Sequence, residues 1–146
     1  MNRLLLLLLL LLSALLSIST PLFAMEQAIQ LETPTGVIKG TLTLPQGESK
    51  APVVLVIAGS GPTDRDGNTP MAAGKNDSLK LLAAALRGYG IASVRYDKRG
   101  IAASKGAACS EADLRFEHYV QDAASWITKL AKDSRFAGVT VLGHSE

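Results

Sequence analysis

Three short strand-like runs rich in apolar residues, separated by two stretches of helical spacing, constrain the fold of this 146-residue chain more than any other feature. The runs occupy residues 53–57, 91–96 and 139–142. The first is continuous, apolar and β-branched, which is typical of a strand that helices bury on both faces. The order strand, helix, strand, helix, strand predicts right-handed crossovers and a parallel sheet. We therefore expect an α/β fold.

Both stretches between the runs carry apolar residues at the spacing of one helix face. We expect the first helix to begin at the capping side chains of residues 76–78 and to end at Gly88. Gly138 separates the second helix from the last strand. The residues that we expect on the inward face of the second helix are Phe116, Val120, Ala123, Ile127 and Leu130.

Ahead of these elements, residues 28–31 and 37–44 alternate in polarity around the turn-forming residues 33–36. This pattern predicts a β-hairpin at the edge of the sheet. The length allows one domain at most, which we assign to residues 25–146.

The first 24 residues have the pattern of a secretory signal peptide. Arg3 precedes a leucine-rich run at residues 4–16, and Ala24 offers a small residue for cleavage. An uncleaved membrane anchor is the alternative, but the apolar run is short against the roughly 20 residues that a spanning helix needs. We expect export to the periplasm or the medium, and no contact with a membrane beyond this segment.

Charge and composition exclude several classes of function. The chain has 15 basic and 13 acidic residues, and removing Arg3 leaves 15 − 1 = 14 basic residues against 13 acidic ones. A near-neutral chain gives no electrostatic reason to bind nucleic acid. Cys109 is the single cysteine, and His118 and His144 are far apart in sequence, so no metal site is indicated. No dinucleotide or phosphate-loop fingerprint is present, and we expect no cofactor.

Each of the three apolar runs is followed by a segment that could carry chemistry. The segments are Ala-Gly-Ser-Gly-Pro-Thr-Asp-Arg-Asp-Gly at 58–67, Asp-Lys-Arg-Gly at 97–100 and Gly-His-Ser-Glu at 143–146. The last reads as G-x-S-x, a nucleophile elbow that lacks only its final glycine. Flanking glycines suit a sharp turn at which strand and helix come close together.

Together these segments resemble the α/β-hydrolase superfamily, in particular the serine aminopeptidase S33-like and dienelactone-hydrolase-like esterases. The resemblance extends from about residue 30 to the end of the chain. It implies that Ser145 is the nucleophile and that the main-chain N–H groups of Ser60 and Glu146 form an oxyanion hole. It also implies that Gly59 and Gly61 let the backbone approach the substrate closely.

The chain departs from the family pattern in two places. Ala58 stands where many relatives have histidine, and the segment after Gly100 lacks a second glycine. We interpret Asp97 and Arg99 as structural residues that pair or bond main chain beneath the site.

Neither histidine is expected to act as the catalytic base. His118 precedes the serine, whereas in this fold the acid and the histidine follow it, so we expect a helix-surface residue. His144 is the variable residue of the elbow and should pack beside the turn.

The resemblance places the catalytic acid and histidine after residue 146. The chain then corresponds to the N-terminal half of the hydrolase sheet, a truncated fragment that would be inactive alone and prone to aggregate through an exposed strand edge. We expect a serine hydrolase that acts on a small ester or a short peptide through an acyl-enzyme on Ser145. A non-catalytic α/β-hydrolase-like remnant or binding module is the alternative.

Overall fold

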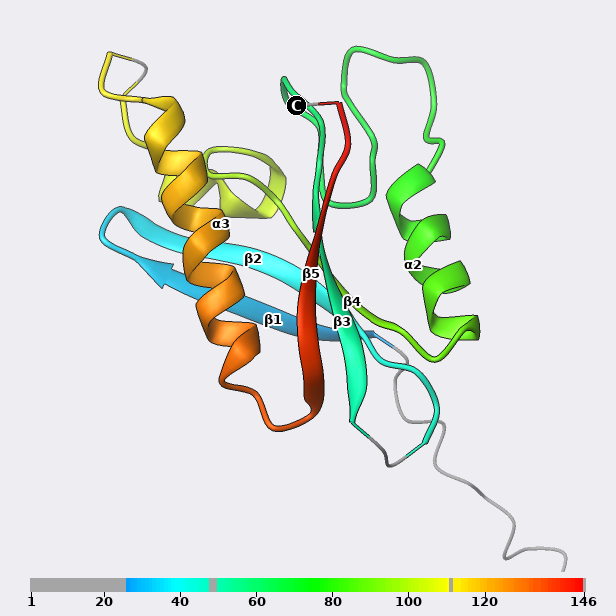
Figure 1. Cartoon of the computed structure of the whole chain (residues 1–146). Coiled ribbons are helices and arrows are strands. Elements are labelled where there is room, and N and C mark those ends of the chain that lie inside the picture. Colours follow the sequence, from blue (N-terminus) through cyan, green and yellow to red (C-terminus); the bar gives the residue numbers. More distant parts are fainter. Residues whose placement is uncertain (1–25, 48–49, 111, 146) are drawn as a thin grey trace, which may run out of the picture.

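The computed structural model describes residues 26–47, 50–110 and 112–145. The expected signal peptide and Glu146 lie outside the described residues. Within them, a five-stranded sheet has a helix on each face (Figure 1). The strands are β1 (Glu26–Thr33), β2 (Gly36–Thr43), β3 (Ala51–Ile57), β4 (Ala92–Tyr96) and β5 (Phe136–Gly143). The helices are α2 (Ser78–Gly88), the 3-10 helix η1 (Ala102–Ala107) and α3 (Phe116–Ala131).

The strands lie in the order β1-β2-β4-β3-β5. β1 and β2 form the expected antiparallel hairpin at one edge, which closes at the pair Thr33 and Gly36. β3 runs parallel to both β4 and β5, as the three apolar runs predict, whereas β2 meets β4 antiparallel. The C-terminal ends of β3, β4 and β5 therefore lie together at one end of the sheet, where the three motif segments begin.

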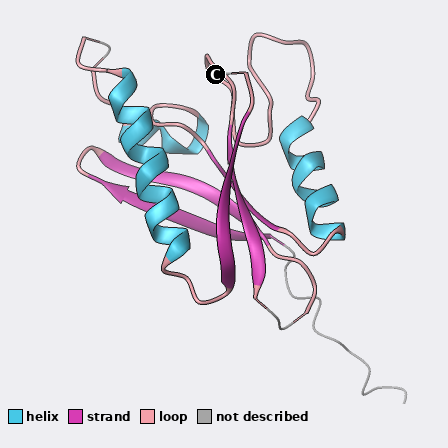
Figure 2. Cartoon of the chain, viewed as in Figure 1, coloured by secondary structure: helices cyan, strands magenta, loops and turns pink. Residues whose placement is uncertain are grey.

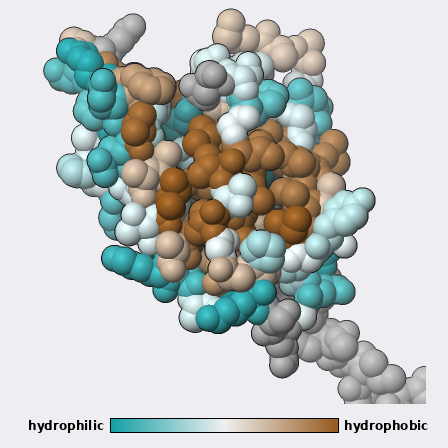
Figure 3. Space-filling view, in the orientation of Figure 1, coloured by the Kyte–Doolittle hydropathy of each residue, from teal (hydrophilic) through white to brown (hydrophobic). Residues whose placement is uncertain are grey.

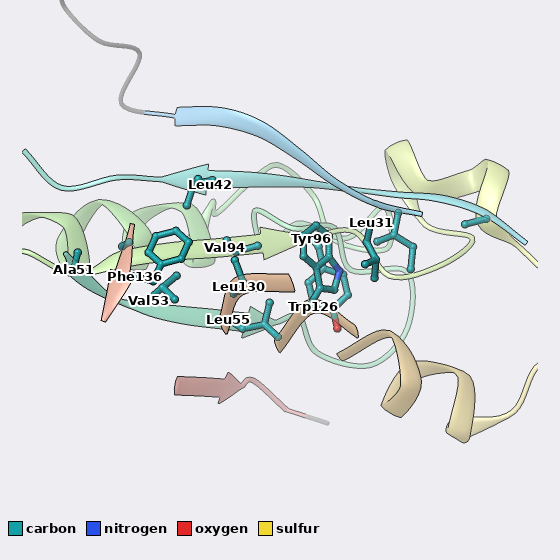
Figure 4. Close-up of a cluster of buried hydrophobic side chains, with 13 residues drawn as sticks. Leu31, Leu42, Ala51, Val53, Leu55, Val94, Tyr96, Trp126, Leu130 and Phe136 are labelled. Carbon is teal, nitrogen blue, oxygen red and sulfur yellow. The ribbon is translucent and has the colours of Figure 1, made fainter. Parts of the chain in front are cut away.

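The two helices cover opposite faces of the sheet, as Figure 2 shows. Successive strand side chains point to opposite faces, so β3 supplies both layers. Leu55 packs with Trp126 and Leu130 of α3, and Val56 packs with Leu79 of α2. Figure 4 shows the larger of these clusters, in which the rings of Tyr96 and Trp126 lie 5.6 Å apart between centroids. Burial of each large apolar side chain contributes about 1.5–3 kcal/mol.

The ends of α2 differ in detail from the expected capping. Asp77 stands at the N-cap position, but its side chain caps no helix N–H group. Its carboxylate instead accepts a hydrogen bond of 2.7 Å from Nδ2 of Asn68 in the preceding loop. Gly88 is the last helical residue, and the left-handed exit falls on Gly90, whose φ is 76°. The Asp77 carboxylate therefore bonds to the loop through Asn68 and does not cap the helix.

The inward face of α3 was predicted wrongly in part. The buried residues of this helix are Asp122, Trp126 and Leu130, whereas Phe116 and Val120 are 68% and 52% exposed. The helix is rotated because Trp126 fills the core and Asp122 meets a buried arginine.

Three apolar residues of α3 line a groove on the side of the helix that faces the end of β3. Phe116, Val120 and Ile127 lie along it with Ile57 and Gly143. Figure 3 shows hydrophobic side chains gathered between the two helices over β5, the edge strand of the described sheet.

Candidate active site

The turns that follow β3 and β5 lie side by side at the C-terminal end of the sheet (Figure 1). The two strands pair in register up to Ile57 and Gly143. Beyond this pair the main-chain N–H of His144 donates to the carbonyl of Ile57 at 3.1 Å, and that of Ser60 donates to the carbonyl of Ser145 at 3.4 Å. Two of the three motif segments are thus in direct backbone contact.

Gly59 is required by this close approach. A Cβ at this position would lie 2.8 Å from the carbonyl oxygen of His144, which is closer than real Cβ contacts come. Gly61 is required for a different reason, because its φ of 72° is left-handed while the space around it is open. The two glycines let the loop turn tightly against the end of β5.

Ser145 has the backbone conformation that a nucleophile elbow needs. Its φ is 56°, a left-handed value that is uncommon for a residue with a side chain. Holding a non-glycine residue in such a region costs on the order of 1–3 kcal/mol, and such strain clusters at active sites. The side chain is exposed at the end of the sheet.

Of the two predicted oxyanion-hole donors, Ser60 lies within the described residues and Glu146 does not. Ser60 is exposed, and its N–H faces the elbow rather than the sheet. The acceptor is the carbonyl of Ser145 at 3.4 Å, a long hydrogen bond. The loop after β3 therefore presents an N–H group to the turn that carries Ser145.

Asp97, directly after β4, holds two loops together. One carboxylate oxygen accepts a hydrogen bond from the N–H of Arg65 at 2.8 Å and the other from the N–H of Ala103 at 3.0 Å. The guanidinium of Arg65 also pairs with Asp97 at 2.9 Å. Asp97 is almost fully buried, which confirms its interpretation as a structural residue that bonds main chain.

Arg99 forms a buried, two-pronged ion pair with Asp122 of α3. Nε and Nη2 donate to the two carboxylate oxygens at 2.8 and 2.6 Å, and Nη1 donates to the hydroxyl of Thr35 at 2.9 Å. The hydrogen bonds that Arg99 donates to the Asp122 carboxylate raise the pKa of Arg99 above its ordinary value. The pair ties the loop after β4 to α3, as the expected pairing role requires.

Sequence reasoning missed Lys98, which lies between these two residues. Its ammonium group is buried and donates to the carbonyl oxygen of Gly59 at 2.5 Å. The same nitrogen lies 5.9 Å from the ring centroid of Tyr119. Its position could have indicated a role at the site, because Lys98 lies two residues after β4, at the same end of the sheet as the other motifs.

The histidines take the places expected of them. Nδ1 of His118 accepts a hydrogen bond of 3.2 Å from the N–H of Arg115 at the beginning of α3. The side chain of His144 packs against Gly59, since a Cβ there would lie 3.3 Å from its Nδ1. In these contacts neither histidine bonds to Ser145 as a general base would.

The described segments 26–47, 50–110 and 112–145 contain neither a candidate metal site nor a candidate membrane-spanning helix. No group of three or more histidine, cysteine, aspartate or glutamate side chains there could hold a metal ion. In the same segments no helix has the length and hydropathy to cross a membrane.

Comparison with known proteins identifies the fold and a related esterase. No family model matches the chain. The chain is 32% identical over 109 residues to Esterase EstD of Thermotoga maritima, an alignment that covers 74% of this chain and 24% of the esterase.

Solved structures support the same fold. XC6422 of Xanthomonas campestris, described as an α/β serine hydrolase without a lid, matches with a TM-score of 0.58 and 22% identity over 86% of this chain and 54% of its own. Est1E of Butyrivibrio proteoclasticus matches with a TM-score of 0.58 and 14% identity over 81% of this chain and 40% of its own.

The chain spans about a quarter of the length of EstD and about half of XC6422. Its strand order, parallel pairings and crossover helices match the N-terminal part of the α/β-hydrolase fold. The chain therefore has the fold of the N-terminal part of the α/β-hydrolase sheet and is similar to hydrolases and esterases of that fold.

Proposed function

We propose that the protein is a serine ester hydrolase in which Ser145 is the nucleophile. The observation that carries the proposal is the left-handed φ of 56° at Ser145, in a turn that directly follows a parallel strand. A strained, exposed serine at this point of the fold is what a nucleophile elbow requires. The similarity to an esterase over 74% of the chain supports the same chemistry.

In this mechanism Oγ of Ser145 attacks the carbonyl carbon of the ester. Its proton passes to a histidine, which then gives that proton to the leaving alcohol as the carbon–oxygen bond breaks. Water hydrolyses the resulting acyl-enzyme by the same route in reverse. In this fold the acid and the histidine follow the nucleophile in the chain, so we assign both to positions after residue 146.

The negative charge on the tetrahedral intermediate would be held by the N–H groups of Ser60 and Glu146. The N–H of Ser60 already faces the elbow, where it donates to the carbonyl of Ser145 at 3.4 Å. To bind the oxyanion, the N–H of Ser60 must give up its hydrogen bond to the Ser145 carbonyl and donate to the oxyanion of the substrate instead. Catalytic hydrogen bonds are often long in the absence of substrate and tighten in the transition state.

We favour a small ester over a short peptide as the substrate, because the related curated protein is an esterase. Membership of the S33-like or dienelactone-hydrolase-like groups rests on the motifs alone. We also propose export, with residues 1–24 as the signal peptide. The test of export is N-terminal sequencing of the protein from a periplasmic extract, where a first residue of Met25 is expected and an intact Met1 would contradict cleavage.

The proposed function is tested with the complete reading-frame product, meaning the protein translated up to the first stop codon after codon 146. Hydrolysis of p-nitrophenyl acetate and butyrate is measured for this protein, for its S145A variant and for the 146-residue chain alone. We expect codon 147 to encode glycine, and we expect turnover in the complete product that S145A abolishes. Loss of a triad member costs several orders of magnitude in rate.

Two results would contradict the proposal. The first is turnover that S145A leaves unchanged, which would place the nucleophile elsewhere. The second is a stop codon at position 147 that independent isolates share, together with an inactive protein. This second result would favour the non-catalytic remnant or binding module.

A further inference from the structure

A buried ammonium group that the proposed mechanism does not use is bonded to the loop that carries Ser60. Lys98 follows β4 by two residues and is 5% exposed. Its Nζ donates a 2.5 Å hydrogen bond to the carbonyl oxygen of Gly59, in the loop after β3. A hydrogen bond from a charged donor to a main-chain carbonyl restricts the orientation of that peptide unit.

The peptide unit between Gly59 and Ser60 connects this hydrogen bond to the candidate site. The carbonyl of Gly59 and the N–H of Ser60 belong to the same peptide bond, which is planar and trans, so the two groups point in opposite directions. Lys98 holds the carbonyl end of this unit. Its N–H end points at the turn that carries Ser145, whose carbonyl it meets at 3.4 Å.

The loop needs such a hold because glycine allows this peptide to rotate. Gly59 has no Cβ, and Gly61 follows in a left-handed conformation with open space around it. Glycines lose more conformational freedom than other residues when they are fixed. A hydrogen bond from a charged donor is roughly twice as strong as a neutral one.

We infer that Lys98 is a positioning residue that aims the Ser60 N–H at the oxyanion by fixing the carbonyl of Gly59. The inference rests on the proposed function, since it assigns Lys98 a part in the oxyanion hole of that same site. The positive charge at the carbonyl end also polarises the peptide and strengthens the N–H as a donor. In this role Lys98 acts through the Gly59 peptide unit, whose carbonyl it contacts.

The kinetic test compares K98M, K98R and K80M in the complete reading-frame product, with S145A as the reference for lost catalysis. Lys80 is exposed on α2, so K80M makes the same chemical change away from the site. Loss of a whole oxyanion donor costs about 10²–10³ in kcat, so a misaimed donor in K98M should cost at least about tenfold. KM should stay within about twofold, because the ester's ground-state contacts do not change.

The activity of K98R and the NMR spectra distinguish a loss of orientation of the Ser60 N–H from a loss of folding. K98R keeps a charged donor and should recover part of the lost kcat, whereas K80M should match the wild type. The carbonyl ¹³C resonance of Gly59 and the amide of Ser60 should both shift in K98M and not in K80M. Where K98M is unfolded at the assay temperature, K98Q, whose shorter side chain cannot reach the same carbonyl, takes its place in every comparison.

The outcomes distinguish this inference from the function on which it rests. If S145A abolishes turnover while folded K98M keeps kcat within twofold of the wild type, the role of Lys98 is wrong and the function stands. An unchanged Gly59 resonance in K98M overturns the inference as well. If S145A leaves turnover intact, the proposed function fails first.

Discussion

Removal of the Asp122 carboxylate is the perturbation for which the structure gives the clearest magnitude. The side chains of Arg99 and Asp122 are 6% and 4% exposed and share two hydrogen bonds of 2.8 and 2.6 Å. D122A leaves the guanidinium buried without its counter-ion. Removing one partner of a buried ion pair costs about 3–5 kcal/mol, a large share of the roughly 5–15 kcal/mol that stabilises a domain.

The assay is urea unfolding of the complete reading-frame product, followed by tryptophan fluorescence. Trp126 is the single tryptophan of the 146 residues, is fully buried and lies one helical turn from Asp122. D133N is the matched control, because Asp133 forms an ion pair with Arg135 whose side chains are 26% and 45% exposed. An exposed pair is worth at most about 1 kcal/mol.

The double variant R99M/D122A separates the cost of an orphaned charge from lost packing. It should recover part of the stability that D122A loses, because replacing both partners by uncharged residues removes the desolvated charge. If D122A unfolds within about 0.5 kcal/mol of D133N, the ion pair does not hold the loop after β4 to α3 and the reasoning is refuted. A double variant as unstable as D122A would place the loss in packing instead.

Three further predictions follow from the described contacts. G59A should destabilise the chain by about 1–3 kcal/mol in urea unfolding, because its Cβ would lie 2.8 Å from the carbonyl of His144; wild-type stability would contradict that close approach. The hydrogen bond from Arg135 lowers the pKa of Asp133 below its ordinary 3.8. This pair therefore stabilises the fold above pH 3.8, and the stabilisation is lost as the pH falls through the lowered pKa. The free energy of unfolding measured across this pH range should lack this small step in R135M, and the same pH dependence in R135M and the wild type would contradict it. V141K on the open edge of β5, where Val141 is 45% exposed, should reduce light scattering by the 146-residue chain, and unchanged scattering would place the aggregating surface elsewhere.

The strands could be predicted because their patterns are local. Runs such as 53–57 are apolar at every position, and burial on both faces of β3 requires that pattern. The hairpin followed from the turn residues at 33–36. The parallel pairing of β3 with β4 and β5 followed from the alternation of strands and helices, whereas the strand order β1-β2-β4-β3-β5 needed the structure.

The buried face of α3 could not be predicted from apolar spacing alone. Hydrophobic periodicity favours Phe116 and Val120, yet the helix turns Asp122 inward because Arg99, twenty-three residues earlier, is buried beside it. Neither charged residue reveals its partner in the sequence. Tertiary pairing overrides local periodicity here.

Part of the candidate site was visible in the motifs and part was not. The place of Ser145 at the end of a strand could be predicted, whereas its left-handed φ needed the structure. Lys98 was missed because its role depends on the direction of one peptide unit, that of Gly59, which no motif encodes.

The most direct test of the proposed nucleophile is covalent trapping. The complete reading-frame product is incubated with a fluorophosphonate, digested and examined by mass spectrometry, with S145A alongside. The account predicts a single phosphonate adduct on the peptide that contains Ser145 and none in the variant. An adduct on another residue, or an equal yield in S145A, would contradict the account.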